Sequence, residues 1–221
     1  MSEPLRAYRF HGRRKGHALR RQHLRLMEEL LPKLRFDGVP PKSPAWLEIG
    51  FGGGEHLAHQ AELHREVSFI GAEPFINGVA KLLALIEAKG IGNIRIHDVD
   101  ARDLLERLPG GSLERIYLLY PDPWPKARHR KRRFVSAATV EQFHRLLVPH
   151  GQFLFASDIA DYIDWTREHV AAHGGWVERG EPSEPFEGWT ETRYEAKAKR
   201  ENRVSSYLKF FKAGVSRETY S

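Results

Sequence analysis

The first hydrophobic pattern along the chain has the period of a helix. Leu26, Leu30, Leu31 and Leu34 recur at helical spacing, which predicts an amphipathic helix over about residues 18–36. An aspartate, a glycine and the proline-rich sequence VPPKSP follow, and these residues end helices. The pattern therefore separates an N-terminal part of the chain from the part that comes after the prolines.

The later hydrophobic positions form short runs, separated by stretches with helical periodicity. The runs typical of buried strands are AWLEI, VSFIGAE, NIRIH, RIYLLY and QFLFAS, with VSSYLKFFK as a last strand after a long polar segment. The intervening stretches predict helices over about residues 55–65, 75–89, 101–108, 134–148 and 159–173. Strands that alternate with crossover helices form a parallel sheet. The expected fold class is α/β, a doubly wound sheet that binds ligands at the carboxyl ends of its strands.

Length and composition agree with one hydrophobic core. The chain has 221 residues, of which 41% are hydrophobic and 29% charged, the range of a single domain. We expect residues 1–17 to form a flexible basic arm that orders on binding a ligand. Residues 18–221 would form one domain, with its core over residues 44–212.

Two absences from the sequence narrow the class of protein. There is no cysteine, which excludes disulfide scaffolds, cysteine-ligated metal sites and thiolate nucleophiles. There is also no apolar run of the about 20 residues that cross a bilayer, nor the apolar stretch of a secretory signal. We therefore expect a cytoplasmic protein without a membrane partner; the alternative for the arginine-rich start is an organelle transit peptide.

The net charge of +6 is unevenly distributed. Residues 1–25 carry eight lysines and arginines against Glu3 alone, and residues 126–133, KARHRKRR, carry six with no acid. The rest of the chain is therefore net acidic. Concentrated basic segments are typical of contacts to a phosphate backbone. A solvated run of charge without a partner is the alternative.

A glycine-rich turn follows the first expected strand. Gly50, Gly52 and Gly54 permit a tight turn in which the backbone approaches a ligand closely. A dinucleotide-binding turn would have a glycine where Glu55 stands, and the carboxylates of Glu48 and Glu55 would repel a pyrophosphate. The turn thus favours a ligand without a phosphate.

Acidic residues accompany four consecutive strand ends. After Glu48, Glu73 lies 21 residues past Gly52, where a carboxylate accepts hydrogen bonds from a ribose diol, and Asp100 and Asp122 follow the next two strands. Helix N-caps are the alternative explanation for such acids. An anionic pocket suits a cationic adenosine cofactor. S-adenosylmethionine, with its sulfonium, ammonium group, ribose diol and no phosphate, fits.

The order of these motifs resembles that of the bacterial tRNA (guanine-N7-)-methyltransferases, members of the class I S-adenosylmethionine-dependent superfamily. EIGFGGG, Glu73 and Asp100 match any class I methyltransferase, whereas PDPWPK followed by RHRKRR is far more specific, and TRYE adds independent weight. The resemblance runs from about residue 10 to residue 211. It implies a Rossmann-like, seven-stranded, mostly parallel sheet with an antiparallel last strand. It also implies methyl transfer from S-adenosylmethionine, which becomes S-adenosylhomocysteine, to a variable-loop guanosine of tRNA.

The resemblance also assigns roles to residues. It places cofactor-binding positions, beside the glycines of the turn, at Glu48, Glu73, Asp100 and Asp122. It places substrate-binding positions at Lys126, Asp158, Thr192, Arg193, Tyr194 and Glu195. We expect tRNA phosphates to be met by the basic run Arg130, Lys131, Arg132 and Arg133. For Thr192 and Glu195 the alternative is a capping box at a helix start.

Guanine N7 carries a lone pair and no proton, so it can attack a sulfonium methyl without a general base. We therefore expect no catalytic histidine and no metal. Orientation of the two reactants would supply much of the rate. Asp122 and Asp158 are the candidate catalytic residues, because a carboxylate that accepts from guanine N1–H and the exocyclic amine would select guanine and stabilise the developing positive charge. The sequence leaves open which of the two makes this contact.

Three other functions stay open at this point. The PDPW sequence resembles the loops of methyltransferases that act on an exocyclic amine such as adenine N6. A dinucleotide oxidoreductase is opposed by Glu48 and Glu55, and a tRNA-binding protein without catalysis is the third. No obligate protein partner is expected for any of them.

Overall fold

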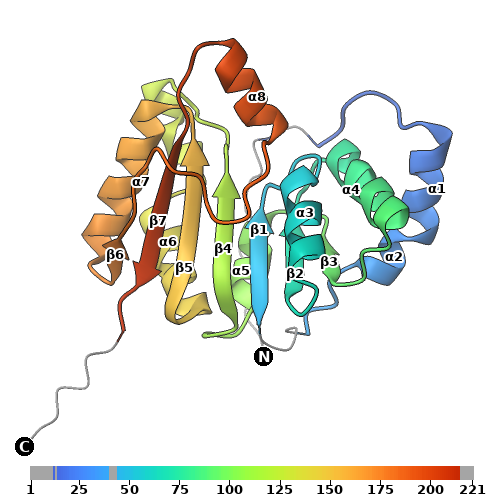
Figure 1. Cartoon of the computed structure of the whole chain (residues 1–221), viewed down its shortest axis with the longest axis horizontal. Coiled ribbons are helices and arrows are strands. Elements are labelled where there is room, and N and C mark those ends of the chain that lie inside the picture. The colour runs from blue at the N-terminus through green and yellow to red at the C-terminus, as the bar shows by residue number, and fades with distance from the viewer. Residues whose placement is uncertain (1–11, 13, 40–43, 215–221) are drawn as a thin grey trace, which may run out of the picture.

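A seven-stranded sheet lies at the centre of the molecule (Figure 1). The computed structural model of the chain describes residues 12, 14–39 and 44–214. In chain order the strands are β1 Ala45–Ile49, β2 Ser68–Ala72, β3 Ile94–His97, β4 Leu113–Leu119, β5 Leu147–Ser157, β6 Trp176–Glu178 and β7 Ser206–Lys212. Across the sheet they follow the order β3-β2-β1-β4-β5-β7-β6.

The strand directions confirm the expected sheet. Neighbours among β1 to β5 are parallel, whereas β7, the last strand of the chain, is antiparallel to both β5 and β6. From β1 the chain moves outward through β2 and β3 and then returns to β4 on the other side of β1. The carboxyl ends of β1 and β4 thus flank the switch point, where doubly wound sheets bind their ligands.

Helices cover both faces of this sheet (Figure 1). They are α1 Arg21–Glu29, α2 Leu31–Leu34, α3 Glu55–Leu63, α4 Ile76–Lys89, α5 Ala101–Arg107, α6 Ala137–Leu146, α7 Ala160–His173 and α8 Arg193–Arg200, with a 3₁₀ helix, η1, at Ala127–Arg132. Buried side chains of α5, α6 and α7 form one hydrophobic cluster with the sheet, and those of α1 to α4 form a second. The two faces of the central strands are therefore buried in two separate hydrophobic cores.

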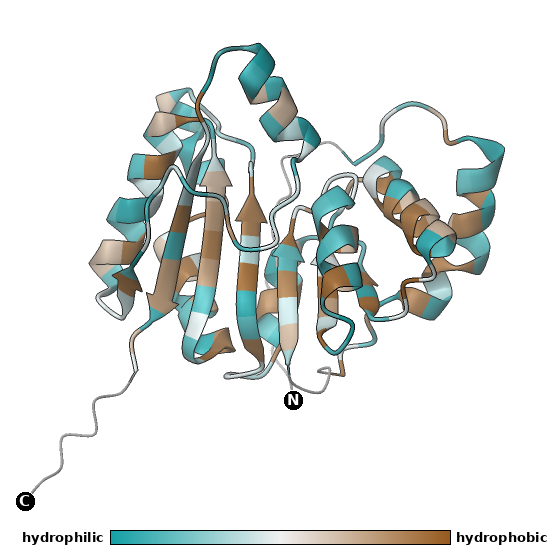
Figure 2. Cartoon of the chain, in the orientation of Figure 1, coloured by the Kyte–Doolittle hydropathy of each residue, from teal (hydrophilic) through white to brown (hydrophobic). Residues whose placement is uncertain are grey.

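Strand β1 shows how the sequence reaches both cores. Leu47 and Ile49 belong to the cluster under α5 to α7, and Trp46 belongs to the cluster under α1 to α4. Successive strand residues point to opposite faces, so a strand covered on both sides is mostly apolar. Figure 2 shows the apolar residues gathered along the strands, while α8, which stands above the carboxyl edge, is mostly hydrophilic.

The N-terminal helix is shorter than expected and is divided in two. Helix α1 begins at Arg21, and α2 starts at Leu31 after a break at Leu30. Pro32 has no N–H to donate to a carbonyl of the preceding turn, and its ring crowds that carbonyl. The hydrophobic pattern continues across the break because both helices bury leucines against the same core.

Residues 14–17 of the expected basic arm lie on the start of α4. The N–H of Ile76 donates to the Arg14 carbonyl at 3.0 Å, and the Gly16 N–H donates to Asn77 Oδ1 at 2.7 Å. The Asn77 amide in turn donates to the His17 carbonyl at 2.7 Å. Residues 1–11 and 13 of the expected arm lie outside the described residues.

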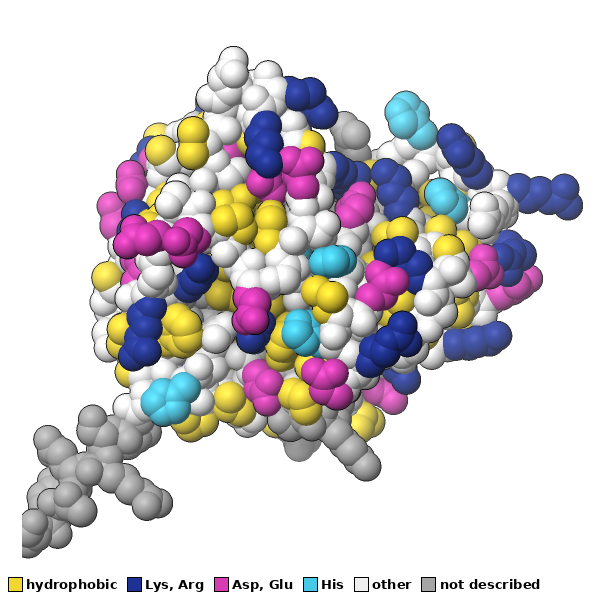
Figure 3. Space-filling model, viewed as in Figure 1, with side chains coloured by type: hydrophobic (Ala, Val, Ile, Leu, Met, Phe, Trp, Pro, Cys, Tyr) yellow, Lys and Arg dark blue, Asp and Glu magenta, His cyan; other side chains and the backbone are white. Residues whose placement is uncertain are grey.

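The surface of the molecule is rich in charge. On the face shown in Figure 3, lysine and arginine side chains are numerous near α1 and over α8, with acidic side chains between them. Of the helices in the described ranges, none combines the length and the apolar character that crossing a membrane requires.

Candidate active site

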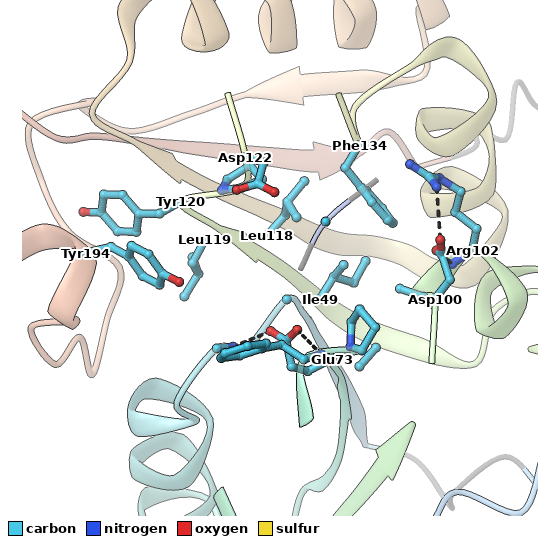
Figure 4. Close-up of a pocket in the computed structure, with 18 of the residues that line it drawn as sticks. Ile49, Glu73, Asp100, Arg102, Leu118, Leu119, Tyr120, Asp122, Phe134 and Tyr194 are labelled. Carbon is cyan, nitrogen blue, oxygen red and sulfur yellow. Dashed lines mark hydrogen bonds and ion pairs between the residues drawn. The ribbon is translucent and has the colours of Figure 1, made fainter. Parts of the chain in front are cut away.

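A cavity of about 440 Å³ opens at the switch point of the sheet, above the carboxyl ends of β1, β2 and β4 (Figure 4). Its volume is in the range of small-molecule sites. The residues that line it are Gly12, Ile49, Gly50, Gly52, Ala72, Glu73, Pro74, Phe75, Asp100, Ala101, Arg102, Leu118, Leu119, Tyr120, Pro121, Asp122, Trp124, Arg132, Phe134, Arg193 and Tyr194. The strand ends therefore bring together acidic, apolar and aromatic side chains from distant parts of the chain.

The glycine turn forms one wall of this cavity. Because its glycines have no side chains, its backbone lies close to neighbouring segments. Gly52 has a φ of +57°, and a Cβ there would lie 2.9 Å from Nη2 of Arg193. Gly78 on α4 lies so close to the turn that a Cβ would be 2.1 Å from the Gly52 carbonyl oxygen. Sequence reasoning missed Gly78, because a lone glycine in a helix carries no sign of what approaches it. The turn therefore presents its backbone to the cavity, and a side chain at either glycine would collide with a neighbouring group.

Glu73 holds this turn in place. Its Oε2 accepts from the Gly52 N–H at 2.8 Å, and its Oε1 accepts from the Phe75 N–H at 2.9 Å. The residue is 8% exposed, and burial raises the pKa of its carboxyl. Each carboxylate oxygen has a second lone pair, so Glu73 can still accept hydrogen bonds from a ligand in the cavity.

Asp100 lies across the cavity at the N-cap of α5. Its Oδ1 accepts from the Arg102 N–H at 3.0 Å, and its Oδ2 accepts from Arg102 Nη1 at 3.1 Å. Asp100 is therefore both the helix cap that such acids often are and a residue of the cavity wall. Phe134 lies beside this pair in Figure 4 and makes that end of the cavity apolar.

The loop after β4 presents Asp122 between two residues in an unusual backbone conformation. Tyr120 has a φ of 47° and Trp124 a φ of 43°, values that cost non-glycine residues about 1 to 3 kcal/mol each. Such strain persists only where the surrounding structure fixes it. The Asp122 carboxylate has no hydrogen-bond partner among the described residues, and partial burial raises its pKa. The loop thus holds an unpaired carboxylate in the wall of the cavity.

Arg133 fixes that loop to α7. Its Nε donates to the Pro123 carbonyl at 2.8 Å, and its guanidinium forms an ion pair with Asp161. The same guanidinium lies over the rings of Tyr162 and Trp165, 4.8 and 5.0 Å from their centroids. Arg133 is 3% exposed, so in this structure its charge is used within the protein.

Replacing Arg133 by alanine is therefore expected to lower the free energy of unfolding by about 2 to 4 kcal/mol, since it removes charged hydrogen bonds and two ring contacts. Urea unfolding measures this. Arg128→Ala, which removes an exposed arginine of the same run, is the matched control and should change the value by less than about 0.5 kcal/mol. Equal effects of the two changes would contradict the anchoring role.

The period of η1 explains why neighbouring basic residues have different surroundings. A 3₁₀ helix has three residues per turn, so residues three apart share a side. Arg130 and Arg133 both contact Asp161, with Arg130 Nη2 at 2.7 Å from Oδ1. Arg132 lies over the Trp124 ring at 4.9 Å and lines the cavity. The third side, together with the residue before η1, carries exposed basic side chains at Lys126, Arg128 and Lys131.

The TRYE segment is divided between the cavity and the protein interior. Thr192 is the N-cap of α8, where its Oγ1 accepts from the Glu195 N–H at 3.1 Å. Glu195 is 5% exposed and accepts from Trp189 Nε1 at 2.7 Å and from the Tyr207 hydroxyl at 2.9 Å. Both residues thus position α8. Arg193 and Tyr194, by contrast, line the cavity.

Tyr194 completes the wall beside Asp122. Its ring stacks on that of Tyr120, with centroids 6.3 Å apart and an interplanar angle of 17° (Figure 4). The Tyr120 hydroxyl donates to Ser205 Oγ at 2.8 Å, and burial raises its pKa. Sequence reasoning placed Tyr120 only at the end of a strand, and its position directly before PDPW was the signal that could have identified it.

Besides Glu195, two more of the expected site acids do not line the cavity. Glu48 points to the α3 side of β1, where His56 Nδ1 lies 2.7 Å from its Oε2, and it is 4% exposed. Asp158 follows β5, and Arg203 Nε donates to its Oδ2 at 2.6 Å. Both carboxylates therefore have partners within the protein.

The structure thus divides the expected site residues into two groups. It brings together around the cavity Gly50, Gly52, Glu73, Asp100, Asp122, Arg132, Arg193 and Tyr194. Outside the cavity wall lie Glu48, Gly54, Lys126, Arg130, Lys131, Arg133, Asp158, Thr192 and Glu195. Within the described ranges, no group of three histidine, aspartate or glutamate side chains is arranged to hold a metal ion.

Comparison with known proteins relates this arrangement to a family. Residues 42–208 match the family described as "Putative methyltransferase". The chain is 51% identical over 219 residues to the tRNA (guanine-N(7)-)-methyltransferase of Agrobacterium fabrum, with 92% of this chain and 94% of that protein covered. It is 50% identical over 221 residues to the enzyme of the same name from Rhizobium meliloti, covering 92% and 95%.

Solved structures with a similar fold are more distant in sequence. The 16S rRNA methyltransferase KamB has a TM-score of 0.55 and 18% identity, with 84% of this chain and 92% of that one covered. The antibiotic-resistance methyltransferase Kmr has a TM-score of 0.53 and 18% identity, covering 79% and 89%. At this identity the likeness shows the fold.

Proposed function

Because the chain belongs to the family of the tRNA (guanine-N(7)-)-methyltransferases, we propose that it transfers a methyl group from S-adenosylmethionine to N7 of a variable-loop guanosine in tRNA. The observation that carries this proposal is the cavity at the switch point, with the carboxylates of Glu73 and Asp122 in its walls. These carboxylates can accept hydrogen bonds from a ribose diol and attract a sulfonium or ammonium group, and three arginines, Arg102, Arg132 and Arg193, also line the cavity.

The cavity residues fit S-adenosylmethionine. Glu73, braced by the turn, can accept hydrogen bonds from the ribose diol. Apolar side chains of Ile49, Leu118 and Phe134 can cover the adenine, and Gly52 leaves room for close approach of the backbone. When bound, S-adenosylmethionine supplies a methyl group on a sulfonium centre that leaves as a thioether.

Asp122 is the carboxylate that we propose contacts the guanine edge. It lies in the cavity wall without a hydrogen-bond partner among the described residues, whereas Asp158 is engaged by Arg203. Accepting from guanine N1–H and the exocyclic amine, Asp122 would orient N7 and stabilise the positive charge that methylation places on the ring. N7 loses no proton, so no side chain has to act as a general base.

Exposed basic side chains beside the cavity would bind the tRNA backbone. Lys126, Arg128 and Lys131 are exposed and follow the Asp122 loop directly. Their charges have no ion-pair partner among the described residues, in contrast to Arg130 and Arg133. A polyanion is recognised by such charges through release of its counterions. We expect the enzyme to meet its tRNA in the cytoplasm, without a metal ion or an obligate protein partner.

Replacing Lys126, Arg128 and Lys131 together by alanine should reduce the slope of log Kd for tRNA against log salt by about 2 to 3, since each lost phosphate contact removes about one unit or slightly less. Filter binding at several salt concentrations measures the slope. Arg65→Ala, an exposed arginine just before β2 at the opposite edge of the sheet, is the control and should leave it unchanged. An unaltered slope in the triple variant would place the tRNA elsewhere.

The function itself is tested by incubating the protein with unmodified tRNA and labelled S-adenosylmethionine, followed by nucleoside analysis. The expected product is 7-methylguanosine in the variable loop. Methyl on adenine N6 would identify an exocyclic-amine methyltransferase instead. Binding of tRNA and donor without transfer would identify a binding protein.

A further inference from the structure

Arg193 occupies a distinctive place in the cavity. It is the first residue of α8 and lines the cavity together with Tyr194. Its guanidinium lies against the glycine turn, with Nη2 only 2.9 Å from where a Cβ of Gly52 would stand. The same Nη2 donates to the Tyr194 hydroxyl at 3.2 Å. A cation from the C-terminal part of the chain is therefore held at the backbone of the first strand-to-helix turn.

Within the described ranges, the charge of Arg193 is not neutralised by a direct ion pair. Among the described residues no carboxylate lies within 4.0 Å of its guanidinium nitrogens, and its buried Nε has no hydrogen-bond partner. The guanidinium does act on Glu73 through space, since its charge lowers the pKa of that carboxyl against the larger effect of burial. Arg193 thus has hydrogen-bonding capacity left for an anion.

The other two arginines of the cavity have other partners. Arg102 Nη1 donates to the Asp100 carboxylate at 3.1 Å, and Arg132 lies 4.9 Å over the Trp124 ring, as Arg193 lies 4.9 Å over the Tyr194 ring. Arg193 is the one of the three that stands against the glycine turn. An anionic group of a ligand that passes over this turn would therefore meet Arg193.

S-adenosylmethionine has one anionic group, the α-carboxylate of its methionine part. The Gly52 N–H already donates to Glu73, so the turn does not offer this N–H to the carboxylate. We propose that Arg193 binds the donor's α-carboxylate and thereby selects donors that carry it. The proposal rests on the proposed function. It assigns to the donor a residue of the TRYE segment that sequence resemblance had placed with the tRNA.

Hydrogen bonds around α8 hold the start of this helix in a defined position. Buried Glu195, two residues after Arg193, joins α8 through hydrogen bonds to Trp189 and to Tyr207 on β7. The start of α8 is therefore held at the rim of the cavity by groups that do not touch the donor. Because side chains supported in this way keep their position, a carboxylate contact at Arg193 would discriminate between ligands that differ only in that group.

The experiment compares two ligands by isothermal titration calorimetry: S-adenosylmethionine and decarboxylated S-adenosylmethionine, which keeps the sulfonium and the ammonium group. The wild type should bind the complete donor about 10- to 100-fold more tightly, as expected for a charged hydrogen-bonded pair. In Arg193→Gln the ratio of the two dissociation constants should fall to about 1 or below. Arg193→Lys should keep part of the preference.

Arg200→Gln removes an exposed charge from the other end of α8 and is the matched control, with the wild-type ratio expected. Thermal unfolding of each variant verifies that it is folded. A preference that persists in Arg193→Gln, or a wild type that binds both ligands equally, would overturn this role while leaving 7-methylguanosine formation intact. A wild type that binds neither ligand and methylates no tRNA would overturn the proposed function as well.

Discussion

Asp122→Asn is expected to lower kcat about 100- to 1,000-fold, the range found when a single electrostatic contact to a developing charge is removed. The carboxylate lies in the cavity wall without a partner in the described part of the chain, and asparagine keeps its size but not its charge. Single-turnover methylation with saturating donor and tRNA measures the effect. The free energy of unfolding should change by less than about 0.5 kcal/mol, because among the described residues the Asp122 side chain has no hydrogen-bond partner to lose.

Two further measurements make this expectation specific. Partial burial raises the pKa of Asp122 above its ordinary 3.8, so the rate of the wild type should fall on acidification at a pH above that value, as the carboxylate becomes protonated. This acid limb should be absent in Asp122→Asn. Asp158→Asn is the comparison: loss of kcat there, with Asp122→Asn active, would assign the guanine edge to Asp158.

Glu73→Gln should weaken binding of S-adenosylmethionine about 100-fold while tRNA affinity is kept. The carboxylate receives N–H groups from Gly52 and Phe75, one on each oxygen. A glutamine has one oxygen, so its NH2 would face one of these donors, and the ribose diol would lose a charged acceptor. Calorimetry measures the dissociation constant. Asp98→Asn, another acid near a strand end that pairs with Arg35 outside the cavity, is the control and should bind the donor normally.

Because the pKa of Glu73 is raised, a rise in pH should change stability and donor affinity in opposite directions. Burial holds the folded-state pKa above the ordinary 4.5, so in the interval between them the folded chain keeps a proton that the unfolded chain has lost. The Glu73 contribution to the free energy of unfolding therefore falls as pH rises through this interval. Donor affinity should rise over the same interval, because the ionised form is the better acceptor. A Glu73→Gln variant that shows the wild-type pH profile would contradict both expectations.

Glu73 and the loop around Asp122 both carry a cost in free energy, and the two costs have one explanation. A buried carboxylate and two non-glycine residues with positive φ are each unfavourable by themselves. They persist where the rest of the fold determines them, and both lie in the same cavity. Arg133 is an example. Its buried guanidinium lies over two aromatic rings of α7 and donates a hydrogen bond to the loop, which it holds in place.

Much of the site could be predicted because strand ends are defined in the sequence. Glu73, Asp100 and Asp122 each come directly after an apolar run or close to one, and parallel strands bring their carboxyl ends to one edge. Glu48, however, stands within β1, one residue before Ile49. Since Ile49 faces the cavity side, alternation directs Glu48 to the opposite face, to His56.

The basic run shows where sequence reasoning lacks the necessary information. A row of lysines and arginines has the same composition whether it forms an α-helix, a strand or a loop. As a 3₁₀ helix it sends Arg133 toward Asp161, Arg132 toward Trp124, and Lys131 outward to solvent. Likewise only the packing of α8 separates Arg193, in the cavity, from Glu195, in the interior.

The sequence by itself determined the α/β order, the acidic strand ends and the family, because periodicity and short motifs are local properties of the chain. Only the tertiary structure decided which charged side chains share the cavity. That outcome depends on strand alternation, helix type and the packing of segments more than a hundred residues apart, such as Gly52 and Arg193. The effect of a charged side chain depends on the groups around it, and only the fold determines which groups those are.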